Sequence, residues 1–339
     1  MQWEELMQAP SGSTELDATT TWFCPLDNYA LISAEGENTF TFLQGQCTCD
    51  INQLTRDAEG LGKSVMGAHC NHKGRMHSTF IGAKLSEKEA LLRVHQSIGD
   101  HAQQNLQKYA MLSRVKVQVN ADWSCFGVVG PQSASIISTL ATNTGAARAP
   151  APGESLLLNN DVIVLCHTSN QFELWCRGAV DEKSFENILA LPKQQNGNLF
   201  HMLSIQRGVA ELEGPLIDTL IPQEINFQLT DGISFSKGCY TGQEIVARLH
   251  YKAQLKKHMY LGHVDLEETQ TNAIQTGASL VQESGKSCGV VINAVPTQGS
   301  SQCLFLALCD DDALDDARLQ IDENLCLKIQ WGELPYAIS

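Results

Sequence analysis

The fold is inferred first from the stretch Ser234-Phe235-Ser236-Lys237-Gly238-Cys239-Tyr240-Thr241-Gly242-Gln243-Glu244, which we call the signature stretch. Its two glycines allow positive φ values and a close approach of the backbone to other groups. The run from Glu244 to Leu249 reads as the start of a helix, and Thr241 or Gly242 is suited to cap it. The stretch is therefore expected to form a tight turn that leads directly into a helix.

A cysteine lies on this expected turn. Cys239 follows Lys237 by two residues and precedes the predicted helix N-terminus. A nearby cation and the positive end of a helix dipole both favour the thiolate over the thiol. The alternative is a buried, inert cysteine in a turn. We predict that Cys239 is a reactive thiol and that Lys237 assists it.

The composition is that of an ordinary globular protein. The chain has 339 residues, which predicts two or three domains, and its 43% hydrophobic content permits a sizeable core. The polar residues 1–20 lack the apolar segment of a signal peptide, and no apolar run is long enough to span a bilayer. We therefore expect a cytoplasmic protein with no membrane partner.

The formal net charge of −15 argues against general nucleic-acid binding, because an acidic chain repels phosphate backbones. We expect no stable direct contact with nucleic acid. One local basic cluster follows the signature stretch and consists of Arg248, Lys252, Lys256, Lys257 and His258.

Twelve cysteines without a secretion signal are expected to be reduced thiols. No Cys-x-x-Cys pair is present, which excludes zinc-ribbon and thioredoxin motifs. Cys47 and Cys49 form the closest pair, and on a strand these alternate residues would share a face. Two thiols do not complete a metal site, and the histidines at 69, 72 and 77 lack a suitable further ligand set. No metal site is predicted.

Predicted strands and helices alternate over the first two hundred residues. Asn71 to Arg75 is the predicted turn of a hairpin whose strands are 64–70 and 76–82. Helices are predicted at 98–109, 133–140, 181–191 and 199–205. Neither a Gly-x-Gly-x-x-Gly nor a Walker A string occurs, so we expect no nucleotide-phosphate cradle. Beyond Lys256, five short strands with turns predict a small β-barrel or sandwich.

Three phrases together resemble the YgfZ family of folate-binding proteins, which is related to the T-protein (aminomethyltransferase) of the glycine cleavage system. They are the octapeptide Lys237–Glu244, the run Phe42-Leu-Gln-Gly-Gln46 and the phrase Cys70-Asn-His-Lys-Gly-Arg-Met76. The family is linked to tRNA modification and to the maintenance of iron–sulphur enzymes. The resemblance covers nearly the whole chain and is weakest over 132–200.

The resemblance implies an α+β fold of mixed sheets and helices, partly ferredoxin-like, with a C-terminal antiparallel β-barrel as in the T-protein. It implies three regions. They are an N-terminal α+β folate-binding region at 22–130, a second α+β region with the signature at 131–250, and the barrel at 251–335.

The resemblance also implies a folate site. Two tryptophans serve this site in the YgfZ family, and the matching positions here hold Tyr29 and Phe200. Both keep an aromatic face for stacking but lack the indole N–H. Arg248 and Lys252 are candidate partners for the anionic tail of the folate. Ordinary core aromatics and solvated cations are the alternatives. The implied cofactor is tetrahydrofolate or a derivative, and the remaining signature-loop residues assigned to the site are Gly238, Tyr240, Thr241, Gly242, Gln243 and Glu244.

The expected function follows from the same resemblance. The T-protein uses a carboxylate near the hairpin, where this chain has His77 and Ser78, so ordinary aminomethyl transfer is the least expected activity. The first expectation is a folate-binding protein that supports tRNA modification and the assembly or repair of iron–sulphur enzymes, such as those that thiolate tRNA, with Cys239 as its thiol. A folate-binding regulatory protein without turnover is the alternative. Whether the protein is an enzyme stays open.

Overall fold

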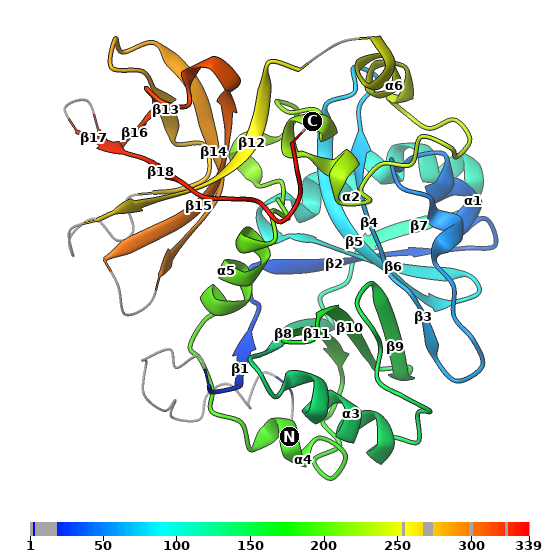
Figure 1. Cartoon of the computed structure of the whole chain (residues 1–339). Coiled ribbons are helices and arrows are strands. Elements are labelled where there is room, and N and C mark those ends of the chain that lie inside the picture. The colour runs from blue at the N-terminus through cyan, green and yellow to red at the C-terminus, as the bar shows by residue number, and fades with distance from the viewer. Residues whose placement is uncertain are drawn as a thin grey trace. The chain divides into compact units, whose positions relative to one another are not determined.

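A computed structural model describes residues 3, 19–252, 255–266, 274–297, 301–322 and 325–338 (Figure 1). The chain divides into two compact units, each built from more than one segment. Unit 1 comprises residues 1–44, 50–66 and 80–200, and unit 2 comprises residues 45–49, 67–79 and 201–339. Two short N-terminal segments therefore belong to the same unit as the signature stretch.

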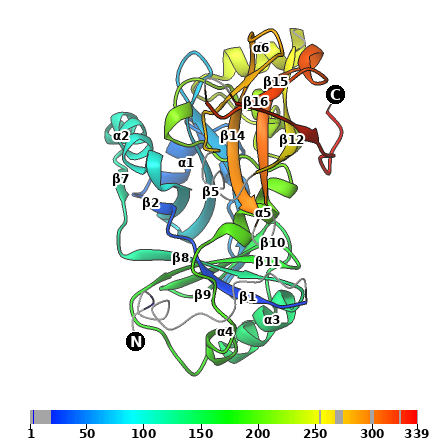
Figure 2. The same ribbon diagram turned by 90° about the vertical axis from the view of Figure 1, so that its left-hand side faces the viewer.

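Unit 1 contains a six-stranded sheet in which all neighbouring strands are antiparallel. Its order is β1 (Trp22–Pro25), β8 (Trp123–Val129), β11 (Gln171–Arg177), β10 (Val162–Thr168), β9 (Glu154–Asn159) and β3 (Leu61–Lys63). The helices α3 (Ser133–Asn143) and α4 (Glu186–Leu189) pack on one face of this sheet (Figure 2). Apolar side chains from both layers form the core there, because alternate strand residues point to the same face.

A second, five-stranded sheet has the order β4 (Val65–Cys70), β5 (Met76–Ser86), β6 (Glu89–His95), β2 (Tyr29–Glu35) and β7 (Lys116–Val119). The helix α2 (Gly99–Ala110) packs against β7, β2 and β6. The division between the units falls inside β4 and β5, so their connecting hairpin belongs to unit 2. The predicted hairpin turn at 71–75 is confirmed, with the Asn71 N–H donating to the Arg75 carbonyl.

Unit 2 ends in a seven-stranded antiparallel sheet that curls into a nearly closed barrel (Figure 1). Its order is β17 (Cys326–Lys328), β16 (Arg318–Gln320), β13 (Ser279–Val281), β14 (Ser287–Thr297), β15 (Gln302–Asp310), β12 (Lys257–Asp265) and β18 (Gln330–Trp331). The alternating apolar residues of these strands point inward and are fully buried around Phe305. The α+β class and the C-terminal barrel are thereby confirmed.

The remaining helices connect these sheets. They are α1 (Thr39–Gln44), α5 (Asn198–Gln206), α6 (Gln243–Lys252) and 3₁₀ turns at Ile51–Gln53, Gln96–Ile98, Met111–Ser113, Gly214–Leu216, Pro222–Ile225, Phe227–Leu229 and Asp311–Ala313. None of the helices within the described residues is long and apolar enough to cross a membrane.

One local prediction was wrong, because the helix predicted over 181–191 shortens to the single turn of α4. Cys47 and Cys49 do not share a strand, since Cys47 makes an isolated bridge to His69 and residues 48–49 form a bend. The carbonyl groups of residues 47–49 bond to the signature stretch.

Candidate functional site

The signature stretch packs against segments 45–49 and 67–79 of unit 2. Thr48 makes hydrogen bonds that connect these segments. Its hydroxyl donates to the Gly232 carbonyl at 2.6 Å and accepts from the Ala68 N–H at 2.9 Å, and its carbonyl accepts from the Ser234 N–H at 2.9 Å. Because Thr48 is fully buried, these bonds are not exchanged with water, and the three segments are fixed to one another.

Lys237 fixes the signature stretch a second time. Its Nζ donates to the carbonyl oxygens of Cys47 and Cys49, each at 2.7 Å, and lies 5.2 Å from the centre of the Tyr240 ring. Charge-assisted bonds of this kind are stronger than bonds between neutral groups. Lys237 therefore connects the signature stretch to segment 45–49. Its predicted assistance to Cys239 stays a prediction.

One of the two signature glycines is required by the structure. Gly242 has φ +85°, and a Cβ there would lie 2.6 Å from the Asn71 carbonyl oxygen and 3.1 Å from the Cys70 Cβ. The close approach brings the turn before α6 onto the β4–β5 hairpin. Gly238 differs, because it has no positive φ and a Cβ there would meet no atom within 4 Å.

Cys239 is set apart from the other cysteines by its exposure. Ten of the twelve are buried, and only Cys239 and Cys326 are exposed. Burial raises the pKa of Cys24 and Cys303 to about 12, so these thiols stay protonated and out of reach. Cys239 is thus the accessible thiol of the signature stretch, four residues before the first residue of α6.

A buried layer of thiols lies beneath the signature stretch. Cys47, Cys49 and Cys70 are all buried, and burial raises the pKa of Cys47 and of Cys70. The phenol of Tyr240 is buried over the same layer, which raises its pKa as well. Within each unit, the described residues hold no group of three His, Cys, Asp or Glu ligand atoms close enough for one metal ion.

The hairpin carries a hydrogen-bonded triad that the sequence analysis missed. Asp218 accepts from Asn71 Nδ2 at 3.0 Å and lies 2.9 Å from His77 Nδ1. Asp218 has φ +59°, a conformation that non-glycine residues rarely adopt. Two backbone hydrogen bonds hold residues 218–220 against β5. The Asp218 N–H donates to the Met76 carbonyl, and the Met76 N–H donates to the Leu220 carbonyl. Carboxylate contact at Nδ1 orients an imidazole and selects its tautomer.

This triad adds a carboxylate that the return strand itself lacks, since His77 and Ser78 occupy the relevant positions there. The structure supplies the carboxylate from Asp218, which is 141 positions further along the chain by residue number. No local motif around Asp218 indicated this, and only the pairing of the 218–220 segment with β5 brings it to the hairpin.

The predicted folate residues Tyr29 and Phe200 both lie in unit 1, in one buried polar network. The Arg93 guanidinium lies 3.8 Å from the centre of the Tyr29 ring, and its Nε lies 3.0 Å from Glu173 Oε1. Glu173 also accepts from Trp175 Nε1 at 2.6 Å and contacts His167 Nε2 at 2.9 Å.

Burial alone would raise the pKa of the Glu173 carboxyl, but Arg93, His167 and Trp175 together hold it below its ordinary value. The charged form is thereby stabilised in the interior.

The far end of this network is Phe200. Its ring meets the His167 ring edge-on at 5.5 Å, and its carbonyl accepts from Gln171 Nε2 at 2.8 Å. Tyr29 is 8% exposed and Phe200 is 1% exposed. Either ring would stack on a pterin only after neighbouring side chains move, so a folate site at these two positions stays a prediction. Cys239, Lys237, Arg248 and the signature loop all belong to unit 2.

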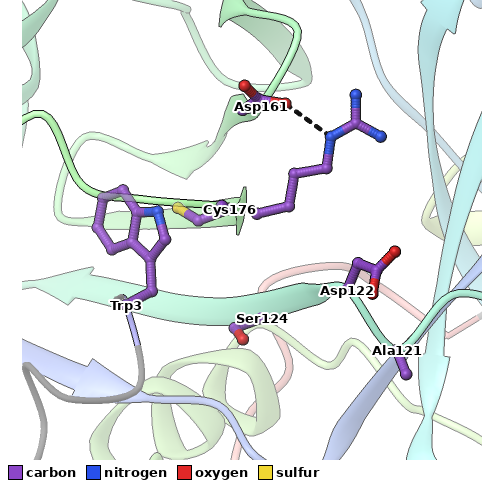
Figure 3. Close-up of a pocket in the computed structure, with 8 residues that line it drawn as sticks. Trp3, Ala121, Asp122, Ser124, Asp161 and Cys176 are labelled. Carbon is purple, nitrogen blue, oxygen red and sulfur yellow. Dashed lines mark hydrogen bonds and ion pairs between the residues drawn. The ribbon is translucent and has the colours of Figure 1, made fainter. Parts of the chain in front are cut away.

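A separate pocket of about 550 Å³ opens in unit 1 (Figure 3). It is lined by Trp3, Ala121, Asp122, Ser124, Asp161, Cys176, Arg177 and Gly178. Arg177 Nε lies 2.7 Å from Asp161 Oδ1, so these two charges neutralise each other, and Asp122 is a further acidic residue of the lining. None of the residues predicted for the site lines this pocket.

Comparisons with known proteins agree with this fold. Residues 23–151 match the GCVT N-terminal domain. A tRNA-modifying protein YgfZ of Yersinia enterocolitica is 30% identical over 96% of this chain and 95% of its own length. The protein of the same name from Aliivibrio fischeri is 27% identical over 93% and 92%.

The glycine cleavage aminomethyltransferase T of Bartonella henselae has a similar fold, with a TM-score of 0.67, 15% identity and coverage of 94% of this chain and 86% of that one. The near full-length match at 30% identity shows that the chain belongs to the YgfZ family.

Proposed function

We propose that this protein binds tetrahydrofolate or a derivative and supports tRNA modification through the assembly or repair of iron–sulphur enzymes, with Cys239 as its reactive thiol. The observation that carries the proposal is the contrast within unit 2. The signature stretch is held to segment 45–49 by bonds from the Ser234 N–H to the Thr48 carbonyl and from Lys237 Nζ to the Cys47 and Cys49 carbonyls, yet it presents Cys239 to solvent. A thiol held on a rigid turn and kept accessible is suited to chemistry with another molecule.

Several findings support the individual parts. The relatives are named tRNA-modifying proteins, which supports the link to tRNA modification. The resemblance to folate-binding proteins, together with the GCVT domain match, supports folate as the cofactor. All twelve cysteines are free, which supports a reducing compartment such as the cytoplasm.

The thiol chemistry has three candidate forms. A thiolate at Cys239 can carry a one-carbon unit, reduce a damaged centre or hold an iron–sulphur species transiently. Arg248, exposed on α6, remains the proposed partner for the anionic tail of folate. In each of these reactions, segment 45–49 would fix the position of the Cys239 thiol.

The test combines binding with rescue. Tetrahydrofolate would be titrated into wild-type protein and into Cys239→Ala. The same proteins would be expressed in cells that lack the native factor, and thiolated nucleosides in tRNA would be measured. Cys326→Ala is the matched control, because it removes the other exposed cysteine. We expect folate binding by all three proteins and rescue by wild type and Cys326→Ala alone.

Two other outcomes change the conclusion. Rescue by Cys239→Ala would favour the alternative of a folate-binding regulatory protein without turnover. Failure of all three proteins to bind tetrahydrofolate would overturn the folate proposal.

Aminomethyl transfer is a second candidate function because Asp218 places a carboxylate beside His77 on the hairpin. A carboxylate and an oriented imidazole are suitable groups to move a proton from a nitrogen. The check is tetrahydrofolate-dependent release of the one-carbon unit from an aminomethyl donor, by wild type and by Asp218→Asn. Activity that is lost in Asp218→Asn would support this candidate, and no activity in wild type would remove it.

A further inference from the structure

We propose that the exposed face of α6 binds unpaired nucleotides of RNA. We call this site the α6 surface. It consists of the exposed residues Arg248, His250, Tyr251 and Lys252 of α6 together with Phe235, a half-buried residue of the signature stretch that stacks on His250. The proposal goes beyond the proposed function, which requires no contact between this chain and RNA. It also departs from the expectation based on net charge, because a local surface can differ in sign from the whole chain.

The α6 surface contains three aromatic rings in mutual contact. The rings of Phe235 and His250 are stacked, with centres 3.7 Å apart and planes inclined by 14°. Tyr251 meets them edge-on, at 6.3 Å from Phe235 and 4.7 Å from His250. Tyr251 is nevertheless 68% exposed. A ring already held by its neighbours loses little freedom when a base stacks on it, and every base offers a π-face.

Two cations flank the exposed tyrosine. Arg248 and Lys252 are exposed and lie four residues apart, and Arg248 lies three residues before Tyr251, so all three share one side of the helix. Among the described residues neither cation has an ion-pair partner. Glu244, one turn before Arg248, is the acidic residue on this side.

Neighbouring cations of the same basic cluster are different. Lys257 Nζ lies 3.0 Å from Asp310 and His258 Nδ1 lies 2.8 Å from Asp311, so acidic groups neutralise them. Of the five basic residues in the cluster, Arg248, Lys252 and Lys256 have no ion-pair partner among the described residues, and the first two lie on the α6 surface. Aromatic rings next to unpaired cations are the combination that binds single-stranded nucleic acid.

The fold does not need the exposed side chains of α6. The helix is held from its other side by the buried Val246, whose carbonyl accepts from Gln223 Nε2 at 2.6 Å. Substitutions on the α6 surface are therefore expected to leave the protein folded. An acidic peptide would satisfy the two cations but would not require the aromatic stack, which is why RNA is the favoured occupant.

The test measures binding of a fluorescein-labelled oligoadenylate of about ten nucleotides by anisotropy at several salt concentrations. We expect Tyr251→Ala to weaken binding about tenfold and Tyr251→Phe to keep it. Tyr109→Ala is the matched control, because Tyr109 is 49% exposed on α2. Arg248→Ala and Lys252→Ala should each reduce the slope of log affinity against log salt by about 0.7.

Three outcomes would overturn the proposal. They are no binding by wild type, equal losses in Tyr251→Ala and Tyr109→Ala, and displacement of the RNA by polyglutamate at equal charge, which would mark a general anion site. The assay contains neither folate nor a Cys239 substitution, so its result is independent of the proposed function.

Discussion

At the scale of single residues, the two glycines of the signature stretch have different physical reasons to be there. Gly242 is held at φ +85°, where a Cβ would lie 2.6 Å from the Asn71 carbonyl oxygen, whereas Gly238 has open space around it. We predict that Gly242→Ala lowers the free energy of unfolding by at least about 1–2 kcal/mol, from the left-handed conformation alone. Gly238→Ala should change it by less than about 0.5 kcal/mol. Urea denaturation of both variants measures the difference.

The same pair separates a structural role from a functional one. If Gly238→Ala is as stable as wild type but fails in the cellular rescue, the absence of a side chain at Gly238 is needed for another molecule to approach Cys239. Equal destabilisation by both substitutions would contradict the steric difference between the two positions.

The buried carboxylate of Glu173 gives a prediction about pH. Its pKa is below its ordinary value of 4.5 in the folded protein. A group of this kind contributes stability that is complete above the unfolded pKa and is lost as the pH falls through the folded pKa. At neutral pH, Glu173→Gln should cost about 3–5 kcal/mol, because it leaves Arg93 charged and buried. The difference from wild type should shrink as the pH falls below 4.5.

Unfolding free energies of the two proteins, measured between neutral pH and acid, provide the check. His167→Asn is a useful companion, because it removes a weaker partner of Glu173 and keeps Arg93 paired. A Glu173→Gln difference that does not change with pH would show that the carboxylate is not ionised in the fold.

At the scale of elements, Asn71 organises the hairpin between β4 and β5. Its Oδ1 accepts from the N–H groups of Lys73 and Arg75, and its Nδ2 donates to Asp218. Asn71→Ala removes all three bonds, and we predict a loss of about 1–3 kcal/mol in unfolding free energy. Hydrogen exchange should also speed up at Met76, whose N–H bonds to the Leu220 carbonyl in the adjoining segment.

The matched control is Asn38→Ala, since the Asn38 amide is exposed and donates to the Ser113 carbonyl. It should cost less and leave the Met76 amide unchanged. Unaltered exchange at Met76 in Asn71→Ala would mean that the backbone alone fixes the 218–220 segment.

The sequence predicted those elements whose signals are local. The hairpin turn, the helix after the signature and the barrel strands each follow from turn residues and apolar periodicity within a short window. The bend at 48–49 and the carboxylate of Asp218 did not follow, because both depend on partners distant in the chain. A local residue pattern does not identify the distant backbone groups with which its polar groups will form hydrogen bonds.

At the scale of the whole molecule, the cysteines divide sharply by burial. Both units contain buried thiols, with Cys24 in the six-stranded sheet of unit 1 and Cys309 in the barrel of unit 2. Burial raises the pKa of each to about 12, and a protonated, enclosed thiol does not react with an alkylating reagent. Reaction at these positions requires that the surrounding structure opens.

We therefore predict that iodoacetamide modifies two of the twelve cysteines in the native protein, Cys239 and Cys326, and all twelve in denaturant. Intact-mass spectrometry after a short pulse counts the modified thiols. Cys239→Ala and Cys326→Ala should each lower the native count to one, and the double variant should react only when it unfolds. A third modified cysteine in the folded protein would contradict this division by burial. If that cysteine were Cys47, Cys49 or Cys70, it would show that the signature stretch separates from segments 45–49 and 67–79. The buried thiols beneath it could then take part in the chemistry of the site.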